Sequence, residues 1–322
     1  MKITKEKFDK KLIELYLKNG YSKDDFNYNA EDFEKKGQNQ KSYPLYFSKK
    51  KWNMFLKNLK EDKEAYKSYV LGGGSETIEK YIKRGKTYNP PKMAAVASSS
   101  RFIYSTFIDK KYKDKISKIV GDILDGEFRF EHILPFKNVS KSFLDGSYIS
   151  KDKAVFLEAK CHEIFDKHKI ILRKAYYESG LLTSDNDFSL QISNVILKDK
   201  TVEINKCEFN LDEEEELLLD VKQFITHLFG IANYNLPNTK KELVYFYFNP
   251  RGIKDLNEES KKFRKELDKK YELLEKQFDA FSNSKPISSF CKRHNISLRL
   301  VYSVNDTFES DLIVDNRLYF EF

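Results

Sequence analysis

Two acids and a lysine lie close together near the middle of the chain: Asp145, Glu158 and Lys160. They occupy two runs of aromatic, β-branched and aliphatic residues that flank a polar tetrad, and this pattern predicts a β-hairpin with a short loop. If the loop is centred between Lys151 and Asp152, Asp145 lies directly opposite Glu158, with Cβ atoms roughly 5 Å apart. Lys160 lies two residues beyond Glu158 and therefore points to the same face of the sheet.

Carboxylates this close repel each other unless a cation lies between them, and a hard divalent ion such as Mg²⁺ prefers oxygen ligands. A lysine beside the ion adds a positive charge that can orient water or stabilise the charge that develops in a reaction. Together these groups suit the attack of water on a phosphodiester. The alternative is a solvent-facing hairpin with charges of both signs. The apolar sequence AVFLEAK around Glu158 favours a functional pair, because charges at the end of a buried strand are often functional.

The order of an Asp on one strand and Glu-x-Lys on the next resembles the signature of the PD-(D/E)XK nuclease superfamily, which includes many restriction endonucleases. The resemblance extends to FRFEHILPF (128–136) and DVKQFITHLFGIANY (220–234), and it covers residues 92–250. These segments are similar to bacterial restriction-endonuclease-like proteins. The superfamily has a proline before the first acid, whereas this chain has Leu144.

The resemblance implies an α/β restriction-endonuclease-like core, with a mixed central sheet flanked by helices, and Mg²⁺ or Mn²⁺ as cofactor. Asp145 and Glu158 would hold the metal together with the backbone carbonyl of Ala159, and Lys160 would assist the water. Superfamily members often bring another acid to the metal from the preceding strand, and Glu131 is the candidate here. The alternative for Glu131 is a carboxylate at the edge of a strand.

A helix is expected from residue 217 to residue 233, directly after the acidic run 212–216, where negative charge favours a helix N-terminus. By resemblance, Gln223 of this helix directs its amide at the metal site, with Lys222 beside it as a nucleic-acid contact. The alternative for Gln223 is an exposed amide. His227 lies one turn further on, where it contacts either the nucleic-acid backbone or only the core.

The net charge of +8 belongs to the first third of the chain. Residues 1–91 contain 21 Lys and Arg against 13 Asp and Glu, so the remainder is neutral overall. Tyrosines, phenylalanines and a tryptophan alternate with these lysines, which suits a surface that neutralises phosphates and packs on bases, with Lys49, Lys50 and Lys51 as contacts. The alternative is a small helical domain with an aromatic core and a solvated lysine surface. The stripe through Trp52 in a helix over 48–70 favours the core for those aromatics.

Glycines at 72–74 and prolines at 90–91 predict a boundary between a basic, mainly helical N-terminal region (1–91) and a nuclease domain (92–322). Within the second, we expect a helix of small residues over 92–120, whose Arg101 and preceding serines meet either a phosphate or a neighbouring helix. The remaining expected elements are a first strand at 128–136, an insertion at 163–217 with a helical stretch and a second hairpin, a buried strand at 243–249, an amphipathic helix at 256–281, a strand at 296–304 and a closing turn in 312–322.

The 322 residues contain no apolar run of about 20 residues, and the N-terminal MKITKEKFDKK has no apolar signal region, so a cytoplasmic protein without a membrane partner is expected. Three scattered cysteines agree with a reducing compartment. The sequence thus predicts a magnesium-dependent DNA endonuclease of restriction or phage-defence type, with any protective methyltransferase on another protein. A homodimer would supply the two sites that cleavage of both strands needs. Two alternatives stay open: a catalytically silent nucleic-acid-binding or regulatory protein, and an RNA-directed toxin nuclease.

Overall fold

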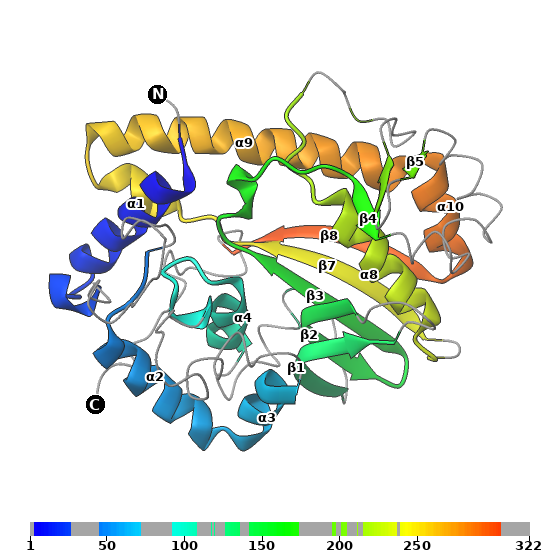
Figure 1. The fold of residues 1–322 in the computed structure, drawn as a ribbon, viewed down its shortest axis with the longest axis horizontal. Coiled ribbons are helices and arrows are strands. Elements are labelled where there is room, and N and C mark those ends of the chain that lie inside the picture. Colours follow the sequence, from blue (N-terminus) through cyan, green and yellow to red (C-terminus); the bar gives the residue numbers. More distant parts are fainter. Residues whose placement is uncertain are drawn as a thin grey trace.

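A five-stranded mixed sheet forms the centre of the molecule in the computed structural model (Figure 1), with the strand order β1-β2-β3-β7-β8. The first three strands pair antiparallel, whereas β3, β7 and β8 are parallel neighbours.

The structure describes residues 3–26, 45–71, 92–107, 117, 119, 126–135, 142–173, 195–197, 201–204, 211, 215–236 and 239–303. The sheet strands are β1 (Gly126–Leu134), β2 (Ser142–Ser150), β3 (Lys153–Lys160), β7 (Lys240–Tyr247) and β8 (Ile296–Tyr302). The helices are α1 (Lys5–Lys18), α2 (Lys49–Glu61), α3 (Lys63–Leu71), α4 (Ser99–Phe107), α8 (Val221–Asn233), α9 (Glu258–Asn283) and α10 (Lys285–Arg293), with short 3₁₀ helices η1 (Lys23–Asp25), η4 (Lys92–Ala94), η5 (Glu163–Phe165) and η6 (Arg251–Asp255). The α/β class with a mixed sheet between helices, expected from the sequence, is therefore confirmed.

Two helices cover opposite faces of the sheet at its centre. Successive side chains of a strand point to opposite faces, and β7 presents Tyr245 to one side and Phe246 to the other. Phe224 of α8 stacks on Tyr245, with ring centroids 3.5 Å apart, and Phe102 of α4 stacks on Phe246 at 4.5 Å. The strand β7 is buried along nearly its whole length because both faces are covered, as its continuous apolar sequence predicted.

The N-terminal region packs its aromatic residues into the same core. Trp52 and Phe55 of α2 are buried, and Phe55 meets Tyr104 of α4 edge to face. Tyr69 of α3 stacks on Phe130 of β1 at 5.5 Å. The prediction that the stripe of α2 belongs to a core is confirmed, so these rings are not available to stack on bases. The predicted helix over 48–70 is interrupted at Asp62, which separates α2 from α3.

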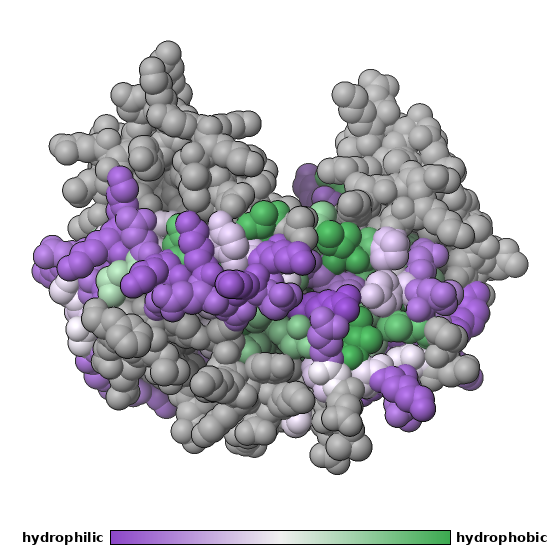
Figure 2. All heavy atoms as spheres, turned by 90° about the horizontal axis from the view of Figure 1, so that it is seen from below, coloured by the Kyte–Doolittle hydropathy of each residue, from purple (hydrophilic) through white to green (hydrophobic). Residues whose placement is uncertain are grey.

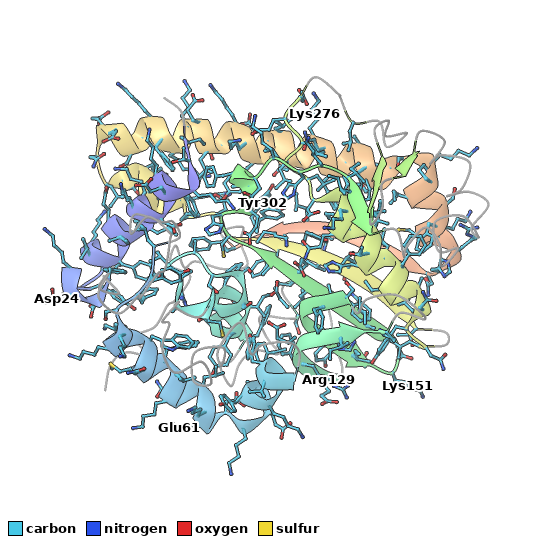
Figure 3. The ribbon with its side chains drawn as sticks, viewed as in Figure 1. Asp24, Glu61, Arg129, Lys151, Lys276 and Tyr302 are labelled. Carbon is cyan, nitrogen blue, oxygen red and sulfur yellow. The ribbon has the colours of Figure 1, made fainter. Side chains whose placement is uncertain are left out.

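The long helix α9 runs along one side of the molecule (Figure 1) and packs against both α8 and β8. Its apolar stripe faces inward, where Phe278 and Phe281 both contact Phe224. Figure 3 shows Tyr302 beneath α9 and Lys276 on its outer side. The amphipathic pattern expected for this segment is confirmed, and α10, which the sequence analysis did not identify, follows directly. No helix in the described ranges has the length and apolar character needed to cross a bilayer.

A separate three-stranded sheet of order β4-β6-β5 confirms the second hairpin within the insertion. Its strands are β4 (Ile171–Arg173), β5 (Val195–Leu197) and β6 (Thr201–Ile204). The predicted helical stretch before it is wrong over 163–173, where one 3₁₀ turn leads into β4. The glycine and proline breaks at 72–74 and 90–91, the part of that stretch beyond 173 and the closing turn in 312–322 lie outside the described residues.

Two further helix predictions need correction. The expected helix over 92–120 does not begin at its small residues: η4 is followed by an isolated bridge between Ala95 and Tyr46, and α4 begins only at Ser99. The helix expected from residue 217 begins at Val221. Glu216 pairs with Lys270 of α9 at 2.9 Å. Glu215 pairs with Lys276 of the same helix at 3.1 Å, so these two acids connect the segment before α8 to α9, which the linear pattern could not indicate.

Candidate active site on the β2–β3 hairpin

The β2–β3 hairpin has the predicted register and places Asp145 beside the β3 backbone. Gly146 pairs with Leu157, and the two-residue loop is Lys151–Asp152, which Figure 3 shows at the end of the hairpin where Lys151 is labelled. Just beyond the last paired residues, the Oδ2 atom of Asp145 accepts a hydrogen bond from the backbone N–H of Ala159 at 2.8 Å. The carboxylate therefore replaces a backbone acceptor at the point where the strand ladder ends, and its position is fixed.

Glu158, Lys160 and Gln223 form a closed triangle of hydrogen bonds. The Nζ atom of Lys160 donates to Oε1 of Glu158 and to Oε1 of Gln223, at 2.6 Å in both cases. The Nε2 atom of Gln223 donates in turn to Oε1 of Glu158 at 2.5 Å. Glu158 and Lys160 are both buried, so this is a desolvated ion pair bridged by an amide. Gln223 therefore belongs to the site and is not an exposed amide.

The start of α8 aims Gln223 at the strands. Asp220 precedes the helix, and its side chain accepts a hydrogen bond from the backbone N–H of Gln223 at 3.0 Å, which satisfies one of the free donors of the first turn. One residue further, Phe224 stacks on Tyr245, so the helix is anchored to β7 directly beside the polar triangle. The parallel register of β3 and β7 places Tyr245 opposite Glu158.

His227 ties α8 to two strands of the sheet and is buried. Its Nε2 atom lies 3.1 Å from the carbonyl oxygen of Phe143 on β2, and its Nδ1 atom lies 3.1 Å from the hydroxyl of Tyr245. A carbonyl oxygen can only accept, so Nε2 carries the proton and Nδ1 accepts from the tyrosine. Glu158 Oε2 lies 3.8 Å from the same Nε2. Of the two roles open to His227 in the sequence, the structure places it in the core, away from a nucleic-acid backbone.

The pKa shifts at the site follow from burial and from three neighbouring carboxylates. Burial, the charge of Glu158 and the charge of Glu131 hold the pKa of Asp145 well above its usual value. Burial also raises the pKa of Glu158, although Lys160 opposes this. Burial alone would lower the pKa of Lys160, but the charges of Glu158 and Glu163 outweigh it, so the pKa is raised and the ammonium stays charged at neutral pH. Burial lowers the pKa of His227 to about 3, so this ring is neutral.

The oxygen atoms of the site suit a divalent cation by their chemistry. Asp145 is repelled by two other carboxylates, those of Glu158 and Glu131, which is the electrostatic situation that a hard cation relieves. Among the described residues, no hydrogen bond reaches the second oxygen of Asp145, Oδ1, and Oε2 of Glu158 has only the His227 ring at 3.8 Å. As the side chains stand in the described ranges, however, no three His, Cys, Asp or Glu residues are grouped as ready-made metal ligands. A metal at this position stays a proposal.

Glu131 lies in β1 with a left-handed backbone, at φ 48°, an unusual conformation for a glutamate. The β1–β2 ladder pairs Phe130 with Gly146 and His132 with Leu144, so Glu131 and Asp145 occupy the intervening position. His132 is buried, and its Nδ1 atom lies 2.9 Å from the hydroxyl of Ser147. Because Glu131 and Asp145 share this position of the ladder, the charge of Glu131 raises the pKa of Asp145.

The predicted nucleic-acid contacts are not brought to the site as a group. Arg101 is wrong as a phosphate contact: its guanidinium is buried, donates to the carbonyl oxygens of Met93 and Val96, and lies over the ring of Phe47. It fastens the turn before α4. Lys222 is exposed on α8 next to Gln223. The lysine run at the start of α2 contains an exposed Lys50 and half-buried Lys49 and Lys51, of which Lys51 pairs with Asp25 at 3.4 Å.

Sequence reasoning missed two residues that complete the surroundings of Lys160. Tyr245 supports His227, but its place opposite Glu158 depends on the parallel pairing of β3 with β7, which no local pattern indicates. Glu163 accepts a hydrogen bond from the backbone N–H of Cys161 at 2.6 Å and adds negative charge near Lys160. Its position three residues after the lysine was the available signal, although the sequence pattern assigns Glu163 to the insertion at 163–217.

A cavity of about 680 Å³ lies elsewhere, between α9, η6 and β8, and none of the site residues lines it. Its wall mixes both charges, with Arg264 paired to Asp268 of the same helix. The candidate site on the hairpin is therefore separate from this cavity.

Comparisons of the chain with protein-family models, with curated proteins and with solved structures found no match. The fold and the candidate site therefore rest on the residues of this chain, and the superfamily resemblance stays a prediction.

Proposed function

We propose that the chain is a metal-dependent nuclease that hydrolyses phosphodiester bonds of DNA through Asp145, Glu158, Lys160 and Gln223. The observation that carries the proposal is the convergence of these four side chains from two strands and a helix, with a buried ion pair bridged by the Gln223 amide. A buried ion pair costs desolvation energy and is weak evidence for stability, so a chemical role accounts for it better than a structural one. Restriction or phage defence is the biological setting that we propose for this activity.

Asp145, Glu158 and the Ala159 carbonyl would hold Mg²⁺ or Mn²⁺, with Glu131 adding negative charge. A divalent ion at these oxygens lowers the pKa of bound water and offsets phosphate charge. In hydrolysis, the attacking water gives up one proton to solvent as its oxygen bonds to phosphorus, the bond to the leaving oxygen breaks, and the leaving oxygen takes up a proton from solvent.

The charged ammonium of Lys160 has a definite role in this scheme. Its pKa is raised, so it cannot accept the proton of the attacking water at neutral pH. It supplies a fixed positive charge for the phosphate and a donor that orients the water. Gln223 holds both Lys160 and Glu158 and so keeps the cation and the anion in one geometry.

Exposed lysines of α2 are our proposed contact for the nucleic-acid backbone. Lys50, Lys57 and Lys60 are exposed along this helix, whose opposite face is buried. Figure 2 views the molecule from the α2–α3 side and shows hydrophilic residues predominating among the residues it colours. A row of lysines neutralises phosphates without reading sequence.

The test is cleavage of supercoiled plasmid, linear duplex DNA and single-stranded RNA with Mg²⁺, Mn²⁺ or EDTA. The parent protein is expected to cut DNA only with a metal, and Lys160→Ala to lose at least roughly a hundredfold in rate, the usual cost of removing one electrostatic group from a reaction centre. Lys153→Ala is the matched control, because Lys153 begins the same strand and pairs with Glu242 outside the site. Metal-dependent cutting that survives in Lys160→Ala would contradict the proposal. Tight binding without cutting would indicate a silent binding protein, and preference for RNA would indicate a toxin-type nuclease.

A further inference from the structure

Phe143 is the one large apolar side chain that is exposed among the described residues, with 38% of its surface accessible. Its neighbours Ser142 and Leu144 are buried, so the strand there is held firmly and only the ring faces solvent. Across the ladder, Phe143 pairs with Ile133 of β1. A ring on a paired strand is positioned more rigidly than a ring on a loop.

The position of Phe143 relates it directly to the candidate site. It precedes Asp145 by two residues on β2, so the two side chains leave the same face of the strand about 6.6 Å apart along it. Its carbonyl oxygen receives the hydrogen bond from His227, whose Nε2 atom also lies 3.8 Å from Glu158. The backbone that carries the exposed ring is therefore fixed by a residue that touches the catalytic cluster.

We infer that Phe143 is a stacking platform for a nucleobase next to the scissile phosphate, and that the preferred substrate is single-stranded or unpaired at that nucleotide. The inference rests on the proposed function. A phosphate at Asp145 and Glu158 brings its neighbouring nucleotide to the adjacent part of β2. In a duplex, each base face is covered by the next base, whereas an unpaired nucleotide can turn its π-face onto an aromatic ring.

The stacking is measured directly with Phe143→Trp, because the chain has one other tryptophan, Trp52, which is buried. Glu158→Gln is added so that the nucleic acid stays intact, and the emission is followed with single-stranded DNA, single-stranded RNA and blunt duplex DNA. We expect quenching by single strands and little by the duplex. The control is Tyr234→Trp in the same Glu158→Gln background: Tyr234 caps the far end of α8, about 16 Å along the helix from Gln223.

Cleavage gives the second readout. Phe143→Ala is expected to raise KM for single strands roughly tenfold and to leave duplex cleavage and kcat nearly unchanged, since base stacking contributes to binding. Phe143→Tyr is expected to restore the parent KM. An unchanged ratio of single-strand to duplex cleavage in Phe143→Ala, or no quenching by a nucleic acid that the protein binds, would overturn the inference alone. Quenching without any cleavage supports stacking and contradicts the nuclease. Neither binding nor cleavage of any nucleic acid overturns both.

Discussion

Removal of the Lys160 charge is expected to destabilise the protein strongly, because Glu158 would remain buried without its counter-ion. The two side chains are only 8% and 6% exposed, and their charged atoms lie 2.6 Å apart. Breaking one partner of such a pair costs about 3–5 kcal/mol. We therefore expect Lys160→Met, which keeps the length of the side chain, to lower the free energy of unfolding by about that amount at pH 7.5 in EDTA.

The double variant Lys160→Met/Glu158→Gln separates the ion pair from packing. With both charges gone, no unpaired charge is left in the interior, and the double variant should recover most of the loss, with a coupling energy of about 2–3 kcal/mol. Lys153 of β3 and Glu242 of the adjacent strand β7 provide the control pair. They are 3.3 Å apart, and Lys153 is 30% exposed, so their coupling should be at most about 1 kcal/mol.

Urea unfolding followed by circular dichroism measures these free energies, with the denaturant slope checked for each variant. The loss in Lys160→Met should shrink as the pH is lowered. The pKa of Glu158 is already raised in the folded protein, and without Lys160 it rises further, so protonation at lower pH removes the buried charge. Single-variant losses below about 1 kcal/mol, or losses that simply add in the double variant, would refute a buried, coupled pair.

Three other predictions follow from the site. Burial and the charges of Glu158 and Glu131 raise the pKa of Asp145, so its ionisation lowers the stability of the fold as the pH rises through that raised pKa. Mg²⁺ should offset this loss and stabilise the parent by about 2.7 kcal/mol at a free ion concentration a hundred times Kd, whereas it should not stabilise Asp145→Asn. Thermal unfolding with and without Mg²⁺ measures both effects. His227→Phe leaves the Tyr245 hydroxyl and the Phe143 carbonyl without their partner, and it should lower the free energy of unfolding in urea by about 1–3 kcal/mol. The His227 ring of the parent is neutral, with a pKa of about 3, so the pH profile of activity between pH 5 and 8 should contain no step that this variant removes. Replacing Lys50, Lys57 and Lys60 by Ala should reduce the slope of log affinity for duplex DNA against log salt by about 3, and an unchanged slope would place the backbone contact elsewhere.

The hairpin could be predicted from sequence because its information is local. Alternating apolar residues on both sides of a polar loop define the register, and the structure pairs Gly146 with Leu157 as that register requires. The convergence of Asp145, Glu158 and Lys160 follows from this register together with strand alternation. Gln223 was placed by resemblance, and its hydrogen bonds to Lys160 and Glu158 agree with that placement.

The rest depends on contacts between distant segments. The local sequence around Arg101 did not indicate that its guanidinium would be buried against Phe47, which is more than fifty residues earlier in the chain. The start of α8 was misjudged because acidic residues near a helix start can serve either the helix or another partner, and here Glu216 pairs with α9, whereas Asp220 caps the helix. The place of Tyr245 opposite Glu158 requires the parallel pairing of β3 and β7, which no local pattern contains.

The central claim is that the buried cluster of Asp145, Glu158, Lys160 and Gln223 cleaves phosphodiesters with a metal. Its most direct test is the rate of Mg²⁺-dependent DNA cleavage by Glu158→Gln beside Glu242→Gln, a carboxylate variant on the adjacent strand whose partners are Lys153 and Arg299. We predict cutting by the parent and by Glu242→Gln, and none by Glu158→Gln at equal folded concentration. Equal cutting by both variants would contradict the assignment of the site.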